Sequence, residues 1–324
     1  MQTTTNLRPY KTTKKKTARD LLYSHYADKL TINQDLSRQL VSYQADKKIP
    51  LYRWMKYKEA FSSELVGFFL NRFGACNGKM PQILDPFAGT GTTLTASAQK
   101  GWKATGIELL PVGVAAMKAR MKAAKINLVA FEKQIKRLEH FPLNSFISGF
   151  RFSHLRITEK AFPAAAEKAI SAYMGFLNEI DDRDVRYLFW FACLSILEDI
   201  SYTRKDGQYL RWDYRSSKVQ ERNHIRTAQG KRLIKEVDKG VLPCVKESLV
   251  RSFEIVLADI AKLQQFNFRE SQQTLIEGNT LLVLPTLESG QFAGVITSPP
   301  YCNRYDYTRT YALELAYLGI GERI

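Results

Sequence analysis

The sequence has little cysteine and histidine and no long apolar run. Its four cysteines and four histidines are scattered without a CxxC pair, so we expect neither a metal site nor a disulfide framework. The longest strongly apolar run, residues 187–197, is too short for the roughly 20 residues of a membrane helix, and the first residues are polar and basic rather than signal-like. We therefore expect a soluble, cytoplasmic protein that does not contact a membrane.

Acidic residues are outnumbered. Asp and Glu total 32 against 48 Lys and Arg, which gives a formal charge of +16 and favours a polyanionic partner. The hydrophobic share of 45% is that of a globular protein and excludes disorder of the whole chain. The first acidic residue is Asp20, so the N-terminus is predicted to be a flexible basic arm, with a solvated tail of no function as the alternative.

Four segments differ in pattern. Residues 1–50 hold the basic arm and short helices, and residues 51–125 alternate between helical and strand patterns, as α/β folds do. Residues 126–270 show helical spacing of apolar residues, clearest over 162–180, 185–200 and 245–263. Strand patterns return in residues 271–324, so the sequence predicts an α/β sheet interrupted by a large, mostly helical insertion.

A glycine-rich turn follows the first predicted strand, residues 82–85. Gly89 and Gly91 allow the backbone to pass close to a ligand at the end of that strand. The next predicted strand ends in Glu108, a position from which a carboxylate can accept hydrogen bonds from both hydroxyls of a ribose. The turn has neither the GxGxxG spacing of dinucleotide sites nor the GxxxxGK[ST] of phosphate-binding loops, so adenosine without a pyrophosphate fits it better.

A second motif lies near the C-terminus, where a strand pattern over residues 292–297 ends in Ser298, two prolines and Tyr301. The prolines stop the hydrogen-bond ladder and fix the direction of the chain. A hydroxyl, a carbonyl and an aromatic ring are therefore expected to converge on one point.

The two motifs together resemble the DNA amino-methyltransferases that use S-adenosylmethionine. Residues 85–93 are similar to the family's cofactor motif, and the sequence from Ile296 to Tyr301 is similar to the signature of the cytosine-N4 branch. Adenine-N6 enzymes more often begin the tetrapeptide with Asp or Asn. The resemblance implies a Rossmann-like class I methyltransferase sheet, a cofactor-binding helix within residues 57–66 and an adenine contact at Asn279.

The resemblance and the turn geometry assign two groups of site residues. Cofactor contacts are predicted for Lys58, Phe61, Ser62, Asp85, Pro86, Phe87, Ala88, Gly89, Thr90, Gly91, Thr92, Glu108 and Asn279. Catalytic roles are predicted for Ser298, Pro299, Pro300 and Tyr301.

The chemistry of an exocyclic amine explains the catalytic residue types. Its lone pair is shared with the ring, so acceptors such as the Ser298 hydroxyl and the Pro299 carbonyl are needed to favour a tetrahedral nitrogen. Tyr301 would stack on a base flipped out of the duplex. Methylation of a ring carbon needs a thiolate instead, and the Pro243–Cys244 pair lacks the Pro-Cys-Gln of that family and is predicted to begin a helix, with Pro243 in its first turn.

Basic and aromatic residues mingle in the insertion between residues 202 and 235. Basic side chains neutralise phosphates and aromatic rings stack on bases, so this region is predicted to bind DNA, with a hairpin or loop at the Asp206–Gly207 turn. The alternative is a solvated face over an aromatic core. The predicted DNA contacts are Arg204, Lys205, Arg211, Trp212 and Arg215.

The resemblance also implies partners. The family's sheet has seven strands and its catalytic motif ends the fourth, so we expect the sheet to be incomplete at the C-terminus and the chain to be either a fragment or a subunit completed by a second polypeptide. Duplex DNA is the expected substrate, and a cognate restriction endonuclease is the family's usual companion. The alternatives are an adenine-N6 enzyme, an RNA base-amine methyltransferase, and an inert half that binds DNA or a partner.

Overall fold

The computed structural model describes residues 17–30, 33–38, 40–74, 81–145, 148–206, 210–234, 237–265, 272–300 and 306–320. The chain divides into two units, Met1–Ser37 and Arg38–Ile324. In the first unit, α1 (Ala18–Tyr26) begins at a capping box formed by Thr17 and Asp20, and no residue of α1 is buried. Most of the predicted basic arm, residues 1–16, lies outside the described residues.

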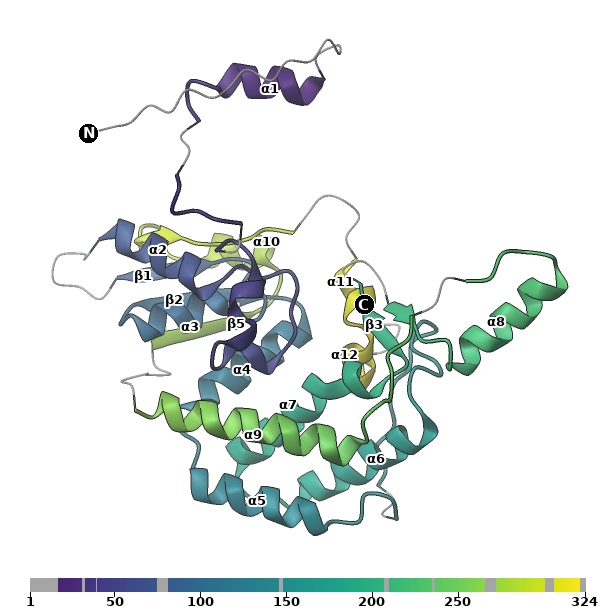
Figure 1. Ribbon diagram of the computed structural model, residues 1–324. Coiled ribbons are helices and arrows are strands. Elements are labelled where there is room, and N and C mark those ends of the chain that lie inside the picture. The colour runs from purple at the N-terminus through teal and green to yellow at the C-terminus, as the bar shows by residue number, and fades with distance from the viewer. Residues whose placement is uncertain are drawn as a thin grey trace. The chain divides into compact units, whose positions relative to one another are not determined.

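A parallel sheet forms the centre of the second unit (Figure 1). Its strands are β1 (Gln82–Asp85), β2 (Lys103–Glu108), β5 (Gln273–Glu277) and β6 (Gly294–Val295), in the spatial order β5-β2-β1-β6. All three neighbouring pairs run parallel, and their carboxyl ends therefore meet at one edge of the sheet. The predicted α/β class and the strand pattern that returns after residue 271 are both confirmed.

Three helices in the described part of the first α/β segment, residues 51–125, pack beside the sheet. They are α2 (Ser63–Phe73), α3 (Thr92–Gln99) and α4 (Pro111–Ala123), preceded by the 3₁₀ turns η1 (Tyr43–Lys48) and η2 (Tyr52–Trp54). Val66 and Leu70 of α2 and Leu94 of α3 pack with Ile83 of the sheet in one apolar cluster. After β5 come α10 (Thr280–Val283) and η4 (Leu284–Thr286), and after β6 come α11 (Tyr307–Thr310) and α12 (Ala312–Tyr317).

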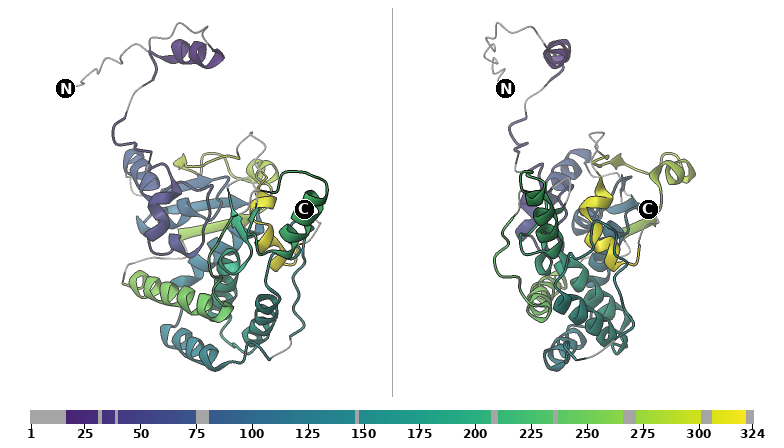
Figure 2. Two further views of the ribbon diagram at one scale, coloured as in Figure 1. Left: turned by 45° about the vertical axis from the view of Figure 1, so that its right-hand side comes forward. Right: turned by 90° about the vertical axis from the view of Figure 1, so that its right-hand side faces the viewer.

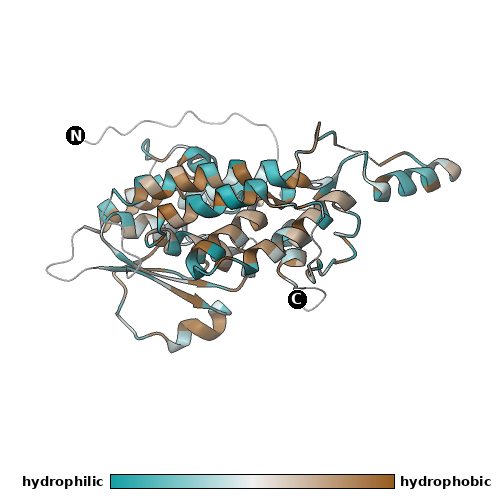
Figure 3. Cartoon of the chain, turned by 90° about the horizontal axis from the view of Figure 1, so that it is seen from below, coloured by the Kyte–Doolittle hydropathy of each residue, from teal (hydrophilic) through white to brown (hydrophobic). Residues whose placement is uncertain are grey.

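The insertion between α4 and β5 is mainly helical, as its apolar spacing predicts. Its elements are α5 (Leu128–His140), α6 (Ala164–Asn178), α7 (Arg183–Ile200), β3 (Thr203–Lys205), β4 (Leu210–Trp212), α8 (Ser217–Ala228) and α9 (Val245–Leu263). These helices carry hydrophobic and hydrophilic residues in alternating bands (Figure 3). The apolar sides of α5, α6, α7 and α9 meet in the larger core cluster, where Phe189 stacks on Phe253 and Phe131 packs edge-on against both.

β3 and β4 pair antiparallel, with Arg204 opposite Arg211, which confirms the predicted hairpin; its tip, residues 207–209, lies outside the described residues. The C-terminal helices α11 and α12, yellow in both views of Figure 2, lie beside this hairpin and connect it to the sheet edge. None of the helices in the described part of the chain has both the length and the apolar character that crossing a membrane requires.

Candidate functional site

A cavity of about 690 Å³ opens at the carboxyl ends of the parallel strands. This is the edge at which open α/β sheets bind their ligands, and the volume lies within the range of small-molecule sites. The lining combines the ends of β1, β2, β5 and β6 with residues of α11 and of the segment before α2. Six residues that the sequence predicts for the site take part in this lining: Phe87, Gly89, Glu108, Asn279, Ser298 and Pro300.

The glycine turn adopts a backbone that most side chains resist. Gly89 has φ +54° and Gly91 has φ +79°, both in the left-handed region. Helix α4 packs closely against the turn, because a Cβ placed on Gly113 would lie 2.3 Å from the Gly89 carbonyl oxygen. Gly113 is thus a residue of the turn's support that the sequence motifs did not indicate.

Glu108 fixes the turn from the end of β2. One carboxylate oxygen accepts a hydrogen bond from the Gly89 amide and the other from the Leu110 amide, both at 2.6 Å. Burial raises the pKa of this carboxyl, and the two amide donors oppose that shift. Each carboxylate oxygen has a second acceptor position, so Glu108 can hold the turn and still accept hydroxyl donors.

Asp85 lies behind the cavity rather than in its wall. Its side chain is 1% exposed and accepts hydrogen bonds from the Thr93 hydroxyl at 2.6 Å, the Thr297 hydroxyl at 2.8 Å and the Phe87 amide at 3.2 Å. Burial raises the pKa of its carboxyl to about 6. The carboxylate of this predicted cofactor residue therefore already accepts hydrogen bonds from three groups of the protein itself.

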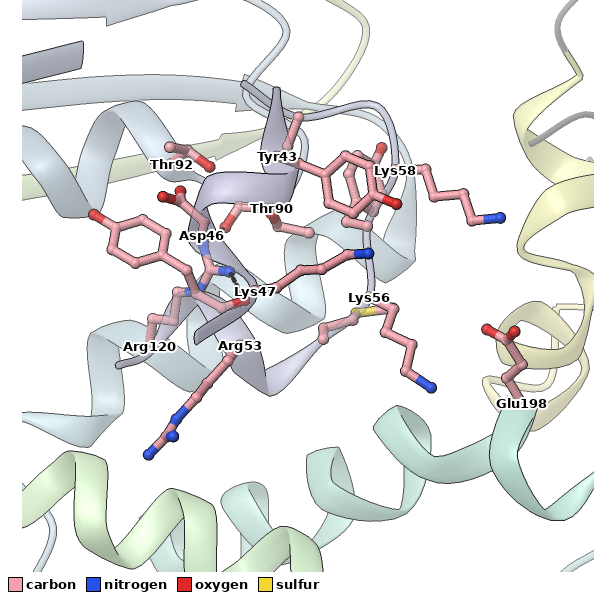
Figure 4. A pocket seen from close by; sticks show the side chains of 14 residues that line it. Tyr43, Asp46, Lys47, Arg53, Lys56, Lys58, Thr90, Thr92, Arg120 and Glu198 are labelled. Atoms are coloured by element: carbon pink, nitrogen blue, oxygen red, sulfur yellow. Dashed lines mark hydrogen bonds between the residues drawn. The ribbon is translucent and has the colours of Figure 1, made fainter. Parts of the chain in front are cut away.

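A second cavity of about 340 Å³ shares Tyr57 with the lining of the first and is drawn in Figure 4. Thr90, Thr92 and Lys58 line it, so three further predicted cofactor residues meet there. The backbone carbonyl of Thr90 accepts a hydrogen bond at 2.6 Å from Arg120, a buried guanidinium whose pKa burial lowers to about 10. Figure 4 shows Lys58 and Thr90 on neighbouring segments around this space.

An aromatic pair separates the cofactor turn from the helical insertion. Tyr57 stacks on Tyr311, with ring centroids 4.8 Å apart and planes 12° apart. The Tyr311 hydroxyl donates to Glu59, and the ammonium of Lys205 lies 4.7 Å from the centre of the Tyr311 ring. Sequence reasoning missed Tyr311, because its role depends on packing between segments that are distant in the chain.

The catalytic segment is described as far as Pro300. Ser298 is half-buried and Pro300 exposed, and both line the larger cavity. Pro299 is exposed and does not line it. Tyr301, the predicted stacking residue, lies outside the described residues.

Several predicted cofactor residues lie outside both cavity linings. The Ser62 side chain is fully buried, caps α2 by accepting a hydrogen bond from the Leu65 amide at 3.1 Å, and donates to the Leu40 carbonyl. Phe61 packs against the apolar cluster of the sheet. Pro86 contributes its carbonyl oxygen, which accepts from Thr280, and Gly91 its left-handed backbone. Ala88 belongs to the apolar cluster of the sheet, and its carbonyl accepts from the Gly91 amide.

Lys205 and Arg215, two of the DNA contacts predicted in the insertion, form ion pairs within the protein. Lys205 was predicted to contact DNA, yet it is 4% exposed and forms an ion pair with the buried Glu314, so this expectation is corrected. Arg215 pairs with Asp213 at 2.7 Å. Neighbouring residues in the sequence do not distinguish a lysine buried in an ion pair from an exposed one. The basic cluster therefore led to a wrong prediction for Lys205.

The other predicted DNA contacts remain at the surface. Arg204 is exposed, and Arg211 is half-exposed and pairs with Asp206 at 2.5 Å. The ring of Trp212 is partly buried and carries the ammonium of Lys218 4.8 Å from its centre. In the described part of the chain, no group of three or more His, Cys, Asp or Glu side chains is placed to hold a metal ion.

Comparison with curated proteins gives relatives of one kind. The chain is 44% identical over 293 residues to the type II methyltransferase M.BsoBI of Geobacillus stearothermophilus, a match that covers 90% of this chain. It is 40% identical over 303 residues, or 93% of its length, to the type II methyltransferases M.AvaI of a Nostoc species and of Anabaena variabilis. This chain resembles type II methyltransferases. The resemblance that two short motifs indicated thus extends over nine-tenths of the sequence.

The chain spans about 57% of the length of the Geobacillus relative and 61% of the others. No family model matches the sequence, and no solved structure matches it.

Proposed function

We propose that this chain carries the cofactor site and catalytic segment of an S-adenosylmethionine-dependent DNA methyltransferase that modifies the N4 amine of a flipped cytosine in duplex DNA. The observation that carries the proposal is the larger cavity, because its wall contains both the glycine turn and Ser298. These motifs are more than 200 residues apart in the sequence (298 − 89 = 209). The relatives' names support methyl transfer.

The residues around the cavity fit the cofactor. Gly89 leaves space where a Cβ would lie 3.2 Å from the ring of Tyr57, and Glu108 at the end of β2 offers acceptors for ribose hydroxyls. Phe87, Ile107 and Leu281 supply apolar surface for an adenine ring. The threonines and lysines of the smaller cavity suit the polar end of the molecule.

S-adenosylmethionine, when bound, supplies an activated methyl group. The contribution of this chain is to orient the amine that receives it. The Ser298 hydroxyl and the Pro299 carbonyl would accept hydrogen bonds from the amine, and the ring of Tyr301 would hold the base once it has left the helix. Because both prolines lack an amide hydrogen, this segment cannot be drawn into the sheet ladder.

A covalent mechanism on a ring carbon has less support. Cys193 is fully buried, and burial raises the pKa of its thiol to about 12. Cys244 caps α9, its sulfur accepting a hydrogen bond from the Glu247 amide at 3.4 Å. Pro243 therefore lies just before the cap rather than in the first turn of the helix, where the sequence placed it. Among the described residues, neither cysteine is therefore suited to act as a thiolate nucleophile; Cys76 and Cys302 lie outside the described residues.

The proposal is tested by methyl transfer from labelled S-adenosylmethionine to duplex DNA, with mass analysis of the nucleosides. We expect N4-methylcytosine, and loss of transfer with preserved cofactor binding in Ser298→Ala. Ser289→Ala, an exposed serine on the turn before β6, serves as the matched control. N6-methyladenine as product would show the alternative target, and preferred methylation of structured RNA would replace DNA as substrate. Undiminished transfer by Ser298→Ala would remove the serine from the mechanism.

We also propose that further polypeptide, either a second chain or the remainder of a longer protein of which this sequence is a fragment, extends the sheet at β6. On the side away from β1, no described strand pairs with β6, and Val295 is 54% exposed. Apolar residues of α10 are exposed as well, Leu281 by 76% and Leu282 by 73%. A strand added beside β6 would cover Val295 and pair the open edge, whereas α10 follows β5 at the opposite edge of the sheet. A restriction endonuclease would act beside the complex in the same system.

Complex formation can be tested directly. The probe is the part of the Geobacillus relative that this chain does not match, mixed with the chain and separated by size-exclusion chromatography. We expect a 1:1 complex with increased methyl transfer, and Val295→Lys should weaken it because it charges the strand edge. Separate elution of the two polypeptides, with full transfer by this chain alone, would contradict the proposal.

A further inference from the structure

Asp85 connects three elements that surround the proposed site. It ends β1, and its carboxylate accepts from Thr93 in the first turn of α3 and from Thr297 in the segment after β6. The Phe87 amide of the glycine turn donates to the same carboxylate oxygen as Thr297. One buried side chain therefore links the turn predicted for the cofactor with the segment predicted for catalysis.

The pairing of β6 with β1 ends just before this point. The Ile296 amide donates to the Leu84 carbonyl at 3.0 Å, and Pro299 and Pro300 have no amide hydrogen to continue the ladder. Beyond Ile296 the Thr297 hydroxyl carries the connection to the sheet, at 2.8 Å from Asp85.

Neighbouring residues of an extended segment point to opposite sides. Thr297 turns inward to Asp85, while Ser298 lies in the wall of the cavity. Fixing the Thr297 side chain therefore fixes the direction in which the Ser298 hydroxyl projects. Rotation of this segment would carry that hydroxyl out of the cavity wall.

We propose that Asp85 is a positioning residue, which holds the catalytic segment against the glycine turn through Thr297, and not a direct ligand of the cofactor. The proposal rests on the function proposed above for Ser298. It agrees with the 1% exposure of Asp85 and with its absence from the lining of either cavity. A carboxylate already holding three donors has little acceptor capacity for a fourth group in a space this enclosed.

The test uses the full chain and two readouts that do not require turnover. Hydrogen exchange of the peptide over residues 292–298 is measured by mass spectrometry, and affinity for S-adenosylmethionine by calorimetry. We expect Thr297→Val to raise exchange in this peptide at least about threefold, while Thr297→Ser keeps it at the native level. Cofactor affinity should stay within about threefold in Thr297→Val and in Asp85→Asn, less than the tenfold that 1.4 kcal/mol represents.

The control is Thr105→Val, because Thr105 is a buried threonine of the sheet whose hydroxyl accepts from Gln82 at 2.8 Å, away from Asp85. It should leave exchange at residues 292–298 unchanged. Native exchange in Thr297→Val, or a loss of cofactor affinity beyond tenfold in Asp85→Asn, would overturn the positioning role. Failure of the native chain to bind the cofactor would instead count against the proposed function, since the exchange comparison needs no cofactor.

Discussion

The buried carboxyl of Asp85 makes the stability of the fold depend on pH in a defined direction. Its pKa rises from 3.8 to about 6 because burial disfavours the charged form more than its three donors favour it. A folded-state pKa above the unfolded one means that stability is fully present below about pH 4 and is lost as pH rises through 6. The difference of about two pH units corresponds to about 3 kcal/mol at pH 8.

Asp85→Asn removes the charge and keeps the shape. The amide oxygen can accept from Thr297 and Phe87, whose donors already share one carboxylate oxygen. The Thr93 hydroxyl would then accept from the new amide and donate to the Ile296 carbonyl, which lies 3.4 Å away. We therefore expect the variant to be more stable than the native chain at pH 8 by up to about 3 kcal/mol, and this advantage to vanish near pH 4.

Urea unfolding followed by tryptophan fluorescence at one-unit intervals from pH 4 to 8 measures this difference. Comparing variant with native chain at each pH cancels the titration of other groups. Asp181→Asn, an exposed aspartate, is the control and should give a flat difference. A variant that is less stable at pH 8, by an amount independent of pH, would refute the reasoning, because it would show that the hydrogen bonds and not the charge decide the balance.

Two further substitutions test the support of the site. Lys205→Met should lower the free energy of unfolding by about 3–5 kcal/mol, because it leaves the buried Glu314 unpaired. Adding Glu314→Leu should recover most of this loss, as measured by urea unfolding. Equal stability of the native chain and the single variant would contradict a buried ion pair. Gly113→Ala should weaken S-adenosylmethionine binding about tenfold in calorimetry, since its Cβ would meet the Gly89 carbonyl, whereas Gly149→Ala, with open space around it, should not. Unchanged affinity in Gly113→Ala would show that the turn tolerates displacement of α4.

The local patterns of the sequence predicted the elements of the fold well. The helical spacing over residues 245–263 coincides with α9, and the spacing over 185–200 lies within α7. The glycine turn and the Ser298 segment were located because their chemistry depends on consecutive residues. These are the features that a single stretch of chain determines.

What the sequence could not give depends on contacts between distant segments. In the sequence, Lys205 does not differ from the exposed basic residues around it. Its burial depends on an ion pair with Glu314, which is 109 positions away. Asp85 was predicted to contact the cofactor, and its carboxylate accepts a hydrogen bond from Thr297 of a distant segment. Ser62 was predicted to bind the cofactor, whereas its hydroxyl caps a helix and donates to Leu40. In each case a polar side chain has a protein partner that spacing along the chain does not reveal.

The position of the insertion has a consequence for how the chain folds. β5 pairs with β2 along its whole length, although Gly106 and its partner Leu275 are separated by the entire insertion. Closing so long a loop is slow unless the intervening chain becomes compact first. The helices α7 and α9 pack on each other and share the larger apolar core, so a compact insertion can bring the two halves of the sheet together. In this order of events the edge that holds the glycine turn and Ser298 is assembled last.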